Sequence, residues 1–435
     1  MLSKEDNELL CRIEGDAPMG RMMRRYWIPA CMAEEVAEPD GDPVRVRLFG
    51  EDLIAFRDSD GRVGVLEEYC PHRGASLVYG RNEGSGLRCL YHGWKMDVDG
   101  NVVDMSSEPQ ASRLSEKIKH VSYPVREAVG LIWVYMGEPE HMPEFEPPAF
   151  ASGPNPKVSV VKIRINCNWA QVLEGAIDSA HSSSLHSSDI RPAKVERAGM
   201  TSAYMTRPST DKSPRLQAQN TEYGMRYAAI RRPLHNSATH DYVRITAFIA
   251  PFTVLIPPNS QYSLAQLSTP EDDTSTMFYF IAWSDDIHGG GGIDQEAWRK
   301  FCGAQVGIDL DKNFNNLRNR QNDYLQDRKG MKINDFTGIR GIPNQDIAMW
   351  ETMGPIARRH KDRLGASDVA IVQFRQRMVE AVKAFRNGAP PLGQAEPRIP
   401  YAQIRSFEGV VPKTVEWVML AKAEAQQPET ASHQG

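Results

Sequence analysis

Two short segments of the sequence each place a cysteine close to a histidine. Cys70 and His72 are separated by one proline, and Cys89 and His92 follow after a gap of sixteen residues. Two thiolates and two imidazoles can hold either a zinc ion or a [2Fe–2S] cluster. In zinc fingers, however, the cysteines lie near each other in the sequence, and the histidines lie near each other on a helix. Here each segment contains one cysteine and one histidine, and both segments lie between expected strands. The pattern therefore favours a cluster in which the cysteines bind one iron and the histidines the other, with structural zinc as the alternative.

The residues around these four are suited to enclosing a cluster. Gly74 and Gly93 would let the backbone approach closely, so that amides can bond to the cluster sulfurs. We expect Arg73, Tyr91 and Trp94 to shield the cluster from solvent rather than to take part in chemistry.

A second group of metal-binding side chains lies at Asp178, His181 and His186. Asp178 and His181 are three residues apart and would share one face of a helix. His186 is five residues beyond His181, which places it about 140° around an ideal helix. Both imidazoles can meet one metal ion only if the helix ends or bulges near residues 182–184, where a serine run competes for backbone hydrogen bonds. Without other context, two such histidines are more often ordinary surface or core residues.

Iron that must leave room for O2 is commonly held by two histidines and one carboxylate. Spacing alone does not identify the carboxylate. Several acids in the later part of the chain are candidates: Asp323, Asp327, Asp335, Asp346 and Glu351.

Two arginines are candidates for binding an anionic substrate, because a guanidinium matches a carboxylate with two parallel hydrogen bonds. Arg244 lies in the middle of an alternating strand-like stretch, and Arg207 lies at the end of another. Either could instead pair with a protein acid. Arg226, Arg231 and Arg232 compete with them, and we expect the adjacent Arg231 and Arg232 to be solvated.

The elements that must position these residues change in character along the chain. Residues 1–28 predict short helices, and the stretch from Pro43 to Gly137 predicts short strands with a hairpin turn at Asp99-Gly100. A proline-rich connector, residues 138–156, is the best domain boundary.

Beyond the connector, a strand precedes a helix around residues 168–182, and strands return from about 200 to 285. Helical patterns cover 293–325 and 367–385, the last with Ser367 as N-cap and Gly388 as stop. We therefore predict an α+β chain with an all-β domain over 26–140. A second domain would combine 1–25 with 150–425, and 426–435 would be a mobile tail.

Composition excludes several classes of protein. The net charge of -5 over 435 residues, without a basic tract, argues against nucleic-acid and membrane-surface binding. The polar N-terminus is unlike a secretory signal, so we expect a soluble cytoplasmic protein. Four of the six cysteines show no metal-like spacing and are expected to be free thiols: Cys11, Cys31, Cys167 and Cys302.

The segments CPHRGASL and LYHGW resemble the Rieske motif, and the later D-x-x-H-x4-H segment resembles that of the Rieske non-haem iron ring-hydroxylating oxygenases. Residues 336–359 are similar to the third-ligand region of that family, which implies Asp346 as the carboxylate ligand of a mononuclear iron. Glu351, one helical turn on, would support the ligands. The resemblance also implies a helix-grip-like catalytic domain with an antiparallel sheet flanked by helices.

The family resemblance gives Asp178 a separate role. In the family this aspartate accepts hydrogen bonds from an iron-bound histidine and from a cluster histidine of the next subunit. Here it would join His181 to His92 of a neighbour, which requires a head-to-tail oligomer, a trimer or stacked trimers.

Within the family, the similarity is greatest to the phthalate 4,5-dioxygenase subgroup. It implies a terminal oxygenase that converts phthalate to its 4,5-cis-dihydrodiol with O2. Electrons would come from NADH through a separate reductase with FMN and a plant-type [2Fe–2S] centre, since the chain has no G-x-G-x-x-G segment of its own. The alternatives are an oxygenase or O-demethylase for another aromatic acid (isophthalate, chlorobenzoate or a sulfobenzoate), an electron-transfer Rieske protein, and a zinc-stabilised binding module.

Overall fold

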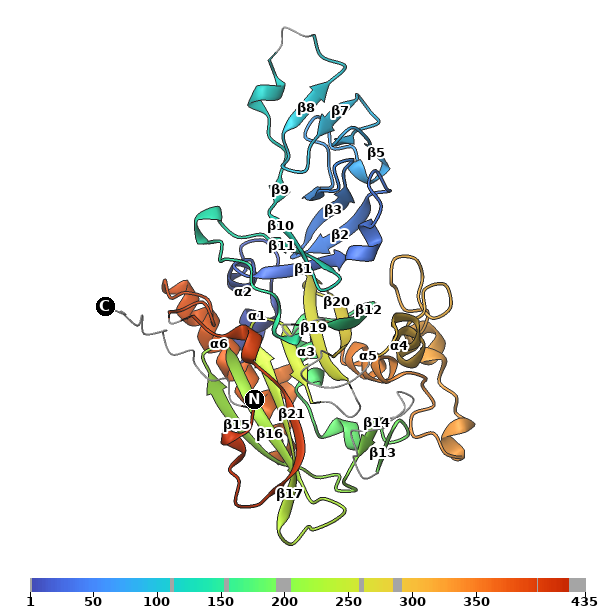
Figure 1. Cartoon of the computed structure of the whole chain (residues 1–435), viewed down its shortest axis with the longest axis vertical. Coiled ribbons are helices and arrows are strands. Elements are labelled where there is room, and N and C mark those ends of the chain that lie inside the picture. Colours follow the sequence, from blue (N-terminus) through green and yellow to red (C-terminus); the bar gives the residue numbers. More distant parts are fainter. Residues whose placement is uncertain are drawn as a thin grey trace, which may run out of the picture.

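The computed structural model describes residues 2–109, 113–151, 156–192, 205–257, 262–284, 292–396 and 398–421. A smaller domain built from strands stands above a larger domain of sheet and helices (Figure 1). The expected α+β class is confirmed. The predicted tail, residues 426–435, lies outside the described residues.

The amino-terminal β domain consists of three small antiparallel sheets. The first contains β1 (Trp27–Met32), β11 (Leu131–Tyr135) and β10 (Val125–Ala128). The second contains β2 (Val44–Leu48), β3 (Glu51–Arg57), β4 (Val63–Glu67) and β9 (Ser122–Tyr123). The third contains β5 (Arg81–Asn82), β6 (Leu87–Arg88), β7 (Trp94–Met96) and β8 (Val102–Met105). The turn predicted at Asp99-Gly100 joins β7 to β8, with Gly100 at a φ of +79°.

One large antiparallel sheet forms the centre of the second domain. Its strands, in spatial order, are β12 (Lys157–Ile165), β20 (Ser275–Ser284), β19 (Ser263–Asp272), β18 (Thr253–Ile256), β17 (His240–Ile249), β16 (Gly224–Arg231) and β15 (Arg215–Thr221). An eighth strand, β21 (Phe407–Pro412), pairs with β17. A short parallel pair, β13 (Ile190–Pro192) and β14 (Met205–Arg207), stands apart.

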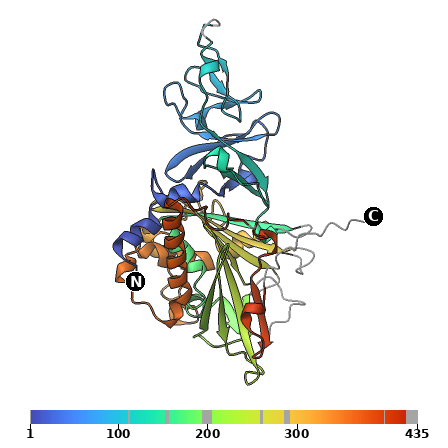
Figure 2. The ribbon, with the colours of Figure 1, turned by 90° about the vertical axis from the view of Figure 1, so that its left-hand side faces the viewer.

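Six α-helices accompany the sheets in the described part of the chain: α1 (Lys4–Cys11), α2 (Pro18–Met23), α3 (Trp169–Ala176), α4 (Gln295–Cys302), α5 (Ile342–Thr352) and α6 (Val369–Arg386). The blue α1 and the orange α6 lie on one face of the large sheet (Figure 2). Leu10, Trp169, Phe248 and Phe374 are buried in the shared core, so helices from both ends of the sequence close over the same strands.

Two helix predictions need correction. Residues 293–325 are not one helical stretch: α4 ends where Gly303 adopts a φ of +62°, a left-handed conformation that terminates helices. The last helix begins at Val369, with Asp368 rather than Ser367 in the capping position. Its stop at Gly388, with a φ of +90°, is as predicted.

The two domains meet where the turn between β2 and β3 contacts the end of β19. The Phe49 N–H donates to the Pro270 carbonyl at 3.3 Å, and the Gly50 N–H donates to the Glu271 carbonyl at 2.7 Å. These backbone bonds fix the smaller domain at one end of the strands of the large sheet.

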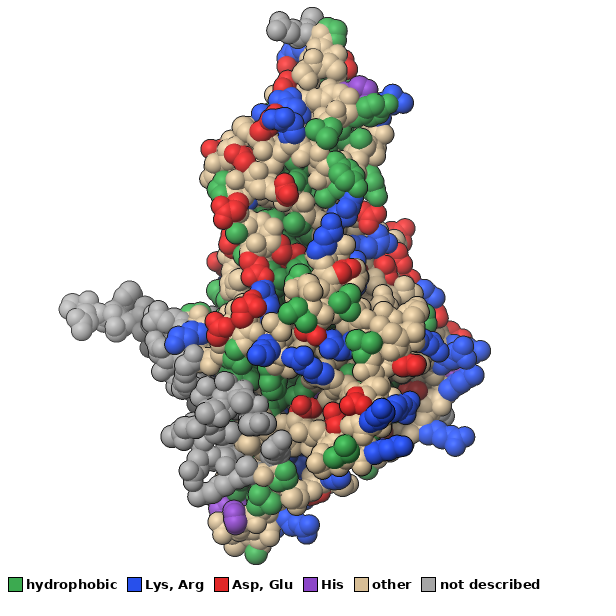
Figure 3. Space-filling model, turned by 90° about the vertical axis from the view of Figure 1, so that its right-hand side faces the viewer, with side chains coloured by type: hydrophobic (Ala, Val, Ile, Leu, Met, Phe, Trp, Pro, Cys, Tyr) green, Lys and Arg blue, Asp and Glu red, His purple; other side chains and the backbone are tan. Residues whose placement is uncertain are grey.

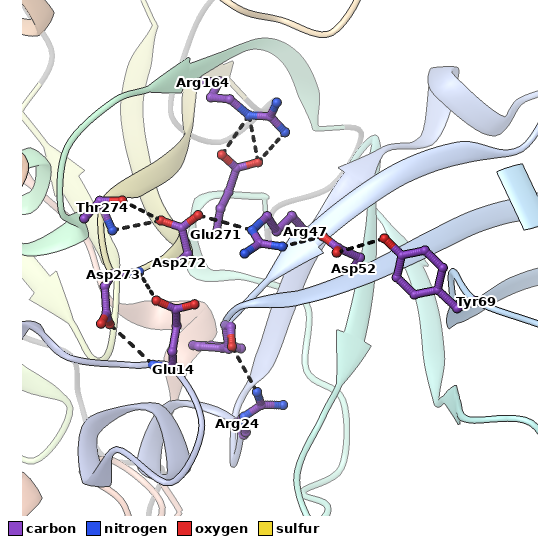
Figure 4. Close-up of polar contacts among 11 residues, drawn as sticks. Glu14, Arg24, Arg47, Asp52, Tyr69, Arg164, Glu271, Asp272, Asp273 and Thr274 are labelled. Atoms are coloured by element: carbon purple, nitrogen blue, oxygen red, sulfur yellow. Dashed lines mark hydrogen bonds and ion pairs between the residues drawn. The ribbon is translucent and has the colours of Figure 1, made fainter. Parts of the chain in front are cut away.

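Side chains reinforce this junction (Figure 4). Arg47 of β2 donates from Nε to Asp272 Oδ2 at 3.2 Å and also pairs with Asp52. The other oxygen of Asp52 accepts a hydrogen bond from the Tyr69 hydroxyl at 3.3 Å. Because Tyr69 directly precedes Cys70, the junction is linked to the first cysteine–histidine loop.

Acidic and basic side chains are interspersed over the face seen in Figure 3, in keeping with the small net charge. Within the described residues, no helix combines the length and the apolar character needed to cross a membrane. All six cysteines are free and buried, as expected for the four without metal-like spacing.

Candidate metal centres and the adjacent cavity

The two cysteine–histidine loops have the same backbone construction. In the first, the Cys70 carbonyl accepts from the Gly74 N–H at 2.9 Å, and in the second the Cys89 carbonyl accepts from the Gly93 N–H at 3.0 Å. Both glycines have positive φ, +71° and +75°. A residue with a side chain is strained in that conformation, so glycine is what allows each loop to close four residues after its cysteine.

The four side chains converge as two pairs. The rings of His72 and His92 have centroids 4.5 Å apart, and His72 Nδ1 is buried with no hydrogen-bond partner in the described part of the chain. Cys70 and Cys89 are both buried, and burial together with the neighbouring Cys89 thiol raises the pKa of Cys70 to about 11. An unpartnered imidazole nitrogen and two buried, adjacent thiols are the donor set of a bound metal group.

This arrangement fits a two-iron cluster better than zinc. A single zinc ion holds its ligands at about 2.0–2.3 Å, so all the ligand atoms must lie close to one another. Among the described residues, only a different group brings three or more such atoms within 4.8 Å of one another. The two cysteines form one pair and the two histidines form another, so each pair can bind one of the two irons of a cluster.

Aromatic rings cover the imidazoles. Trp94 stacks on His72 with a centroid distance of 4.4 Å, and Tyr91 lies 3.9 Å from His92. The Arg73 guanidinium in turn lies over the Tyr91 ring. All three predicted shielding residues therefore lie around the two histidines.

The other group consists of His181, His186 and Asp346, the predicted ligands of the mononuclear iron. The two Nε2 atoms are 3.1 Å apart, and Asp346 Oδ1 lies 3.4 Å from that of His181 and 3.2 Å from that of His186. Two imidazoles and one carboxylate facing a common point suit an iron(II) ion with open positions.

The helix before these ligands ends earlier than predicted. Asn168 caps α3, and the helix finishes at Ala176 rather than near residues 182–184. Asp178 Oδ1 accepts from the backbone N–H groups of Ala180 at 2.8 Å and His181 at 3.2 Å, starting a separate 3-10 turn, His181–Ser183. Such a local bond from an aspartate competes with helix continuation. The break lets both histidines face one point.

Each imidazole is oriented through its other nitrogen. His186 Nδ1 donates to Gln345 Oε1 at 2.7 Å, and Gln345 Nε2 donates to Asp189 at 2.8 Å. His181 Nδ1 lies 3.5 Å from Asp178 Oδ2. Burial lowers the pKa of His181, but the Asp178 hydrogen bond and the Asp346 charge outweigh it and raise the pKa. Partners of this kind leave Nε2 free for a metal.

Glu351 was expected to support the ligands, and this expectation is wrong. Its carboxylate accepts from the Asn166 backbone at 2.9 Å and from the Tyr324 hydroxyl at 2.8 Å instead. Sequence reasoning missed Gln345 in the supporting role, although it is adjacent to a predicted ligand. Glu174 is half-buried between Arg359 and Arg375, each at 2.7 Å, and links α3 to α6.

A cavity opens directly beside the three ligands. Arg207 and Arg244, the two favoured arginines, both line it, together with apolar side chains. Those apolar residues are Ala176, Ile190, Met205, Ile256, Leu264, Phe278, Phe280, Ile342, Pro343 and Trp350. An apolar space with fixed cations beside a metal site suits an aromatic acid.

The arginines differ in their partners. Arg207 donates to the hydroxyls of Ser182 at 2.9 Å and Ser183 at 3.2 Å. Arg244 pairs with Glu408 at 3.2 Å, so the alternative of pairing with a protein acid holds for this residue even though it lines the cavity.

The expectation that Arg231 is solvated is wrong, because only 1% of it is exposed. It donates to the Ser179 carbonyl at 2.7 Å. In the sheet Arg231 is paired with Tyr242, so its side chain shares a face with that of Arg244 two residues further along β17. Arg232 is exposed, as expected, and Arg226 binds carbonyl groups of the C-terminal segment.

Two family models match the chain. One, described as the Rieske [2Fe-2S] domain, covers residues 26–122, and the other, described as LigXa C-terminal domain like, covers 134–434. The chain is 60% identical over 417 residues to the phthalate 4,5-dioxygenase oxygenase subunit of Pseudomonas putida, spanning 96% of this chain and 94% of the relative. It is 35% identical over 429 residues to the 3-chlorobenzoate-3,4-dioxygenase oxygenase subunit of Comamonas testosteroni, spanning 96% and 97%.

Solved structures share the fold. Dicamba monooxygenase bound to 3,6-dichlorosalicylic acid matches with a TM-score of 0.56 at 18% identity, over 84% of this chain and 99% of that one. The terminal oxygenase of carbazole 1,9a-dioxygenase from Nocardioides aromaticivorans matches with a TM-score of 0.53 at 18% identity, over 85% and 98%. The predicted two-part architecture is confirmed by these neighbours.

Proposed function

This chain belongs to the Rieske non-haem iron oxygenases, as the oxygenase component of an aromatic-ring dioxygenase, and from that premise we propose that it adds both atoms of O2 to phthalate, giving the 4,5-cis-dihydrodiol. The observation that carries the substrate is the pair of arginines, Arg207 and Arg244, that lines the cavity beside the three metal ligands. Two guanidiniums next to an apolar slot suit an aromatic ring that bears carboxylates.

The proposed ligands follow the observed geometry. Cys70 and Cys89 bind one iron of the [2Fe–2S] cluster, and His72 and His92 bind the other. The mononuclear iron is held by three residues: His181, His186 and Asp346. When bound, the cluster supplies electrons and the mononuclear iron supplies O2 activation. Within the chain, Gln345 and Asp178 orient the two imidazoles, and the apolar wall of the cavity keeps bulk water from the ring.

The proposal includes partners. Electrons come from NADH through a separate reductase with FMN and a plant-type [2Fe–2S] centre. The cluster loops adjoin β7 near the top of the molecule, and the mononuclear site lies beside α3 and α5 in the lower domain (Figure 1). A neighbouring subunit would bring a second cluster to that site, with Asp178 between His181 and the neighbour's His92. A trimer or stacked trimers would supply such head-to-tail contacts.

A second aromatic acid is the competing substrate, because a 35% identical relative is named for 3-chlorobenzoate. Product analysis with NADH and a cognate reductase separates the two, using phthalate, isophthalate, terephthalate and 3-chlorobenzoate in parallel. We expect phthalate to be consumed with the highest kcat/KM and to give the 4,5-cis-dihydrodiol, and Asp346→Ala to give no product. A higher kcat/KM for any of the other three acids would contradict the assignment.

A further inference from the structure

Arg231 is a buried cation that has no acidic partner among the residues that the structure describes. It lies at the end of β16 behind the cavity wall, and its hydrogen bonds go to neutral groups, the Ser179 carbonyl at 2.7 Å, the Ser179 hydroxyl at 3.2 Å and the Ser183 hydroxyl at 3.4 Å. Its Nε is buried with no hydrogen-bond partner among the described residues. Buried charges are normally paired with an opposite charge, so an arginine held only by neutral oxygens is unusual.

Arg231 is one of three clustered guanidiniums. Arg207 shares Ser183 with it and is likewise held by hydroxyls, and its Nε is also buried without a partner in the described part of the chain. Arg244 has an acid, Glu408. Burial and the charges of Arg207 and Arg244 lower the pKa of Arg231 to about 9, while burial and the charge of Arg244 lower that of Arg207 to about 10. All three therefore remain protonated at neutral pH.

In the described part of the chain, the formal charges around the cavity do not balance without a ligand. Among the described side chains that pair with the three guanidiniums, one carboxylate, Glu408, offsets one positive charge and leaves an excess of two. On the metal side, Asp178 and Asp346 carry two negative charges that would match an iron(II) ion. A ligand with two negative charges would therefore neutralise the buried site, whereas a ligand with one would leave a net cation.

We propose that Arg231 sets the preference of this cavity for a dicarboxylate over a monocarboxylate. Arg207 and Arg244 line the cavity and would contact the substrate, whereas Arg231 does not line it and would act through its charge from behind the wall. This inference rests on the proposed aromatic dicarboxylate substrate, and it assigns a specificity role to an arginine outside the contact set. A charge across a poorly solvated wall still interacts strongly with an anion, because the effective dielectric constant there is low.

Equilibrium binding of phthalate and of benzoate to the iron-loaded holoenzyme tests the proposal without relying on turnover. In the wild type we expect phthalate to bind more tightly than benzoate. Arg231→Gln should weaken phthalate binding about tenfold or more while changing benzoate binding by less than about threefold, since the lost charge acts on two carboxylates in phthalate and on one in benzoate. Arg231→Lys, which keeps the charge and loses the planar fork, should retain most of the preference.

The neighbouring Arg232 provides a matched control because it is exposed and outside the cavity. Arg232→Gln should change neither dissociation constant. Equal weakening of phthalate and benzoate in Arg231→Gln, or loss of the preference in a well-folded Arg231→Lys, would assign Arg231 a purely structural role and overturn the proposal. No change in Arg231→Gln would do the same. A wild type without any preference for phthalate would instead contradict the proposed substrate itself, which is a separate outcome.

Discussion

The orientation of each histidine ligand depends on the group that its Nδ1 atom contacts. His186 is held at 2.7 Å by Gln345, a neutral amide, whereas His181 faces the carboxylate of Asp178 at 3.5 Å. The carboxylate also accepts two backbone N–H groups through Oδ1, so its position is fixed while Oδ2 stays available to His181. The Asp178 carboxylate is therefore suited to place a negative charge next to the iron ligand His181 without itself binding the metal.

We expect Asp178→Asn to keep both metal centres but to lower turnover about 100-fold, because the amide can still accept the backbone N–H groups and lacks the charge. Iron content, the spectrum of the reduced cluster and steady-state rates measure these quantities separately. Asp211→Asn is a suitable control, since Asp211 likewise accepts backbone N–H groups, from Ser213 and Arg232, and does not line the cavity. Normal turnover in Asp178→Asn would contradict the role.

At the residue scale, the sequence predicted the features that depend on the spacing of residue types along the chain. It missed the burial of side chains, which depends on how the strands pair. The alternating types at Cys70, His72, Cys89 and His92 are a local pattern, and the structure brings the four together in two pairs. Arg231 was misplaced because its burial depends on how β16 pairs with β17, which alternation within one strand does not reveal.

At the scale of elements, the end of β19 and the turn after it contact three other segments of the chain. Glu271 of β19 accepts from Arg164 of β12 at 2.7 Å, and Asp272 accepts from Arg47 of the β domain at 3.2 Å (Figure 4). Asp273 accepts from Arg12 at 2.8 Å. Three successive acids thus each bind a different part of the chain at the same end of the large sheet's strands.

The Arg47–Asp272 pair should couple the two domains weakly but measurably. Both side chains are partly exposed, so we expect a double-mutant cycle of Arg47→Gln and Asp272→Asn to give a coupling of about 0.5–1 kcal/mol in the free energy of unfolding. Chemical denaturation monitored by cluster absorbance measures it. Arg45→Gln, on the same strand and paired with Glu68 within the β domain, should show no coupling to Asp272→Asn. A coupling free energy of zero would show that the backbone bonds alone hold the two domains together at the junction.

Helix boundaries illustrate what periodicity leaves undetermined. The apolar stripe of α6 is long and regular, and its range was predicted within two residues. Residues 293–325 form an α-helix only over Gln295–Cys302 and a short 3-10 helix over Arg320–Leu325, because Gly303 ends the first helix and polar side chains then form successive turns. The early end of α3 was missed for a similar reason, since the hydrogen bonds of Asp178 are local and independent of apolar pattern.

At the scale of the whole molecule, the two proposed metal centres belong to different domains that meet at one junction. The cluster histidines are flanked by exposed Tyr91 and Leu90, an apolar surface that could seat against another subunit. The sequence predicted the two domains through the proline-rich connector, but the proposed contact between subunits would involve two copies of the chain and would leave no local pattern in one.

Complementation between two inactive variants tests that arrangement directly. Cys89→Ser should remove the cluster and leave the mononuclear site, and Asp346→Ala should do the reverse, so neither variant alone should turn over. If each cluster serves the iron of the next subunit, then in a 1:1 mixed oligomer half of the chains hold the iron, and half of those have a neighbour with a cluster. Co-expression should then restore about one quarter of wild-type activity. If both centres had to lie in the same chain, the mixture would stay inactive, because no chain in it carries both, and separately purified homo-oligomers mixed without subunit exchange provide the baseline for that comparison.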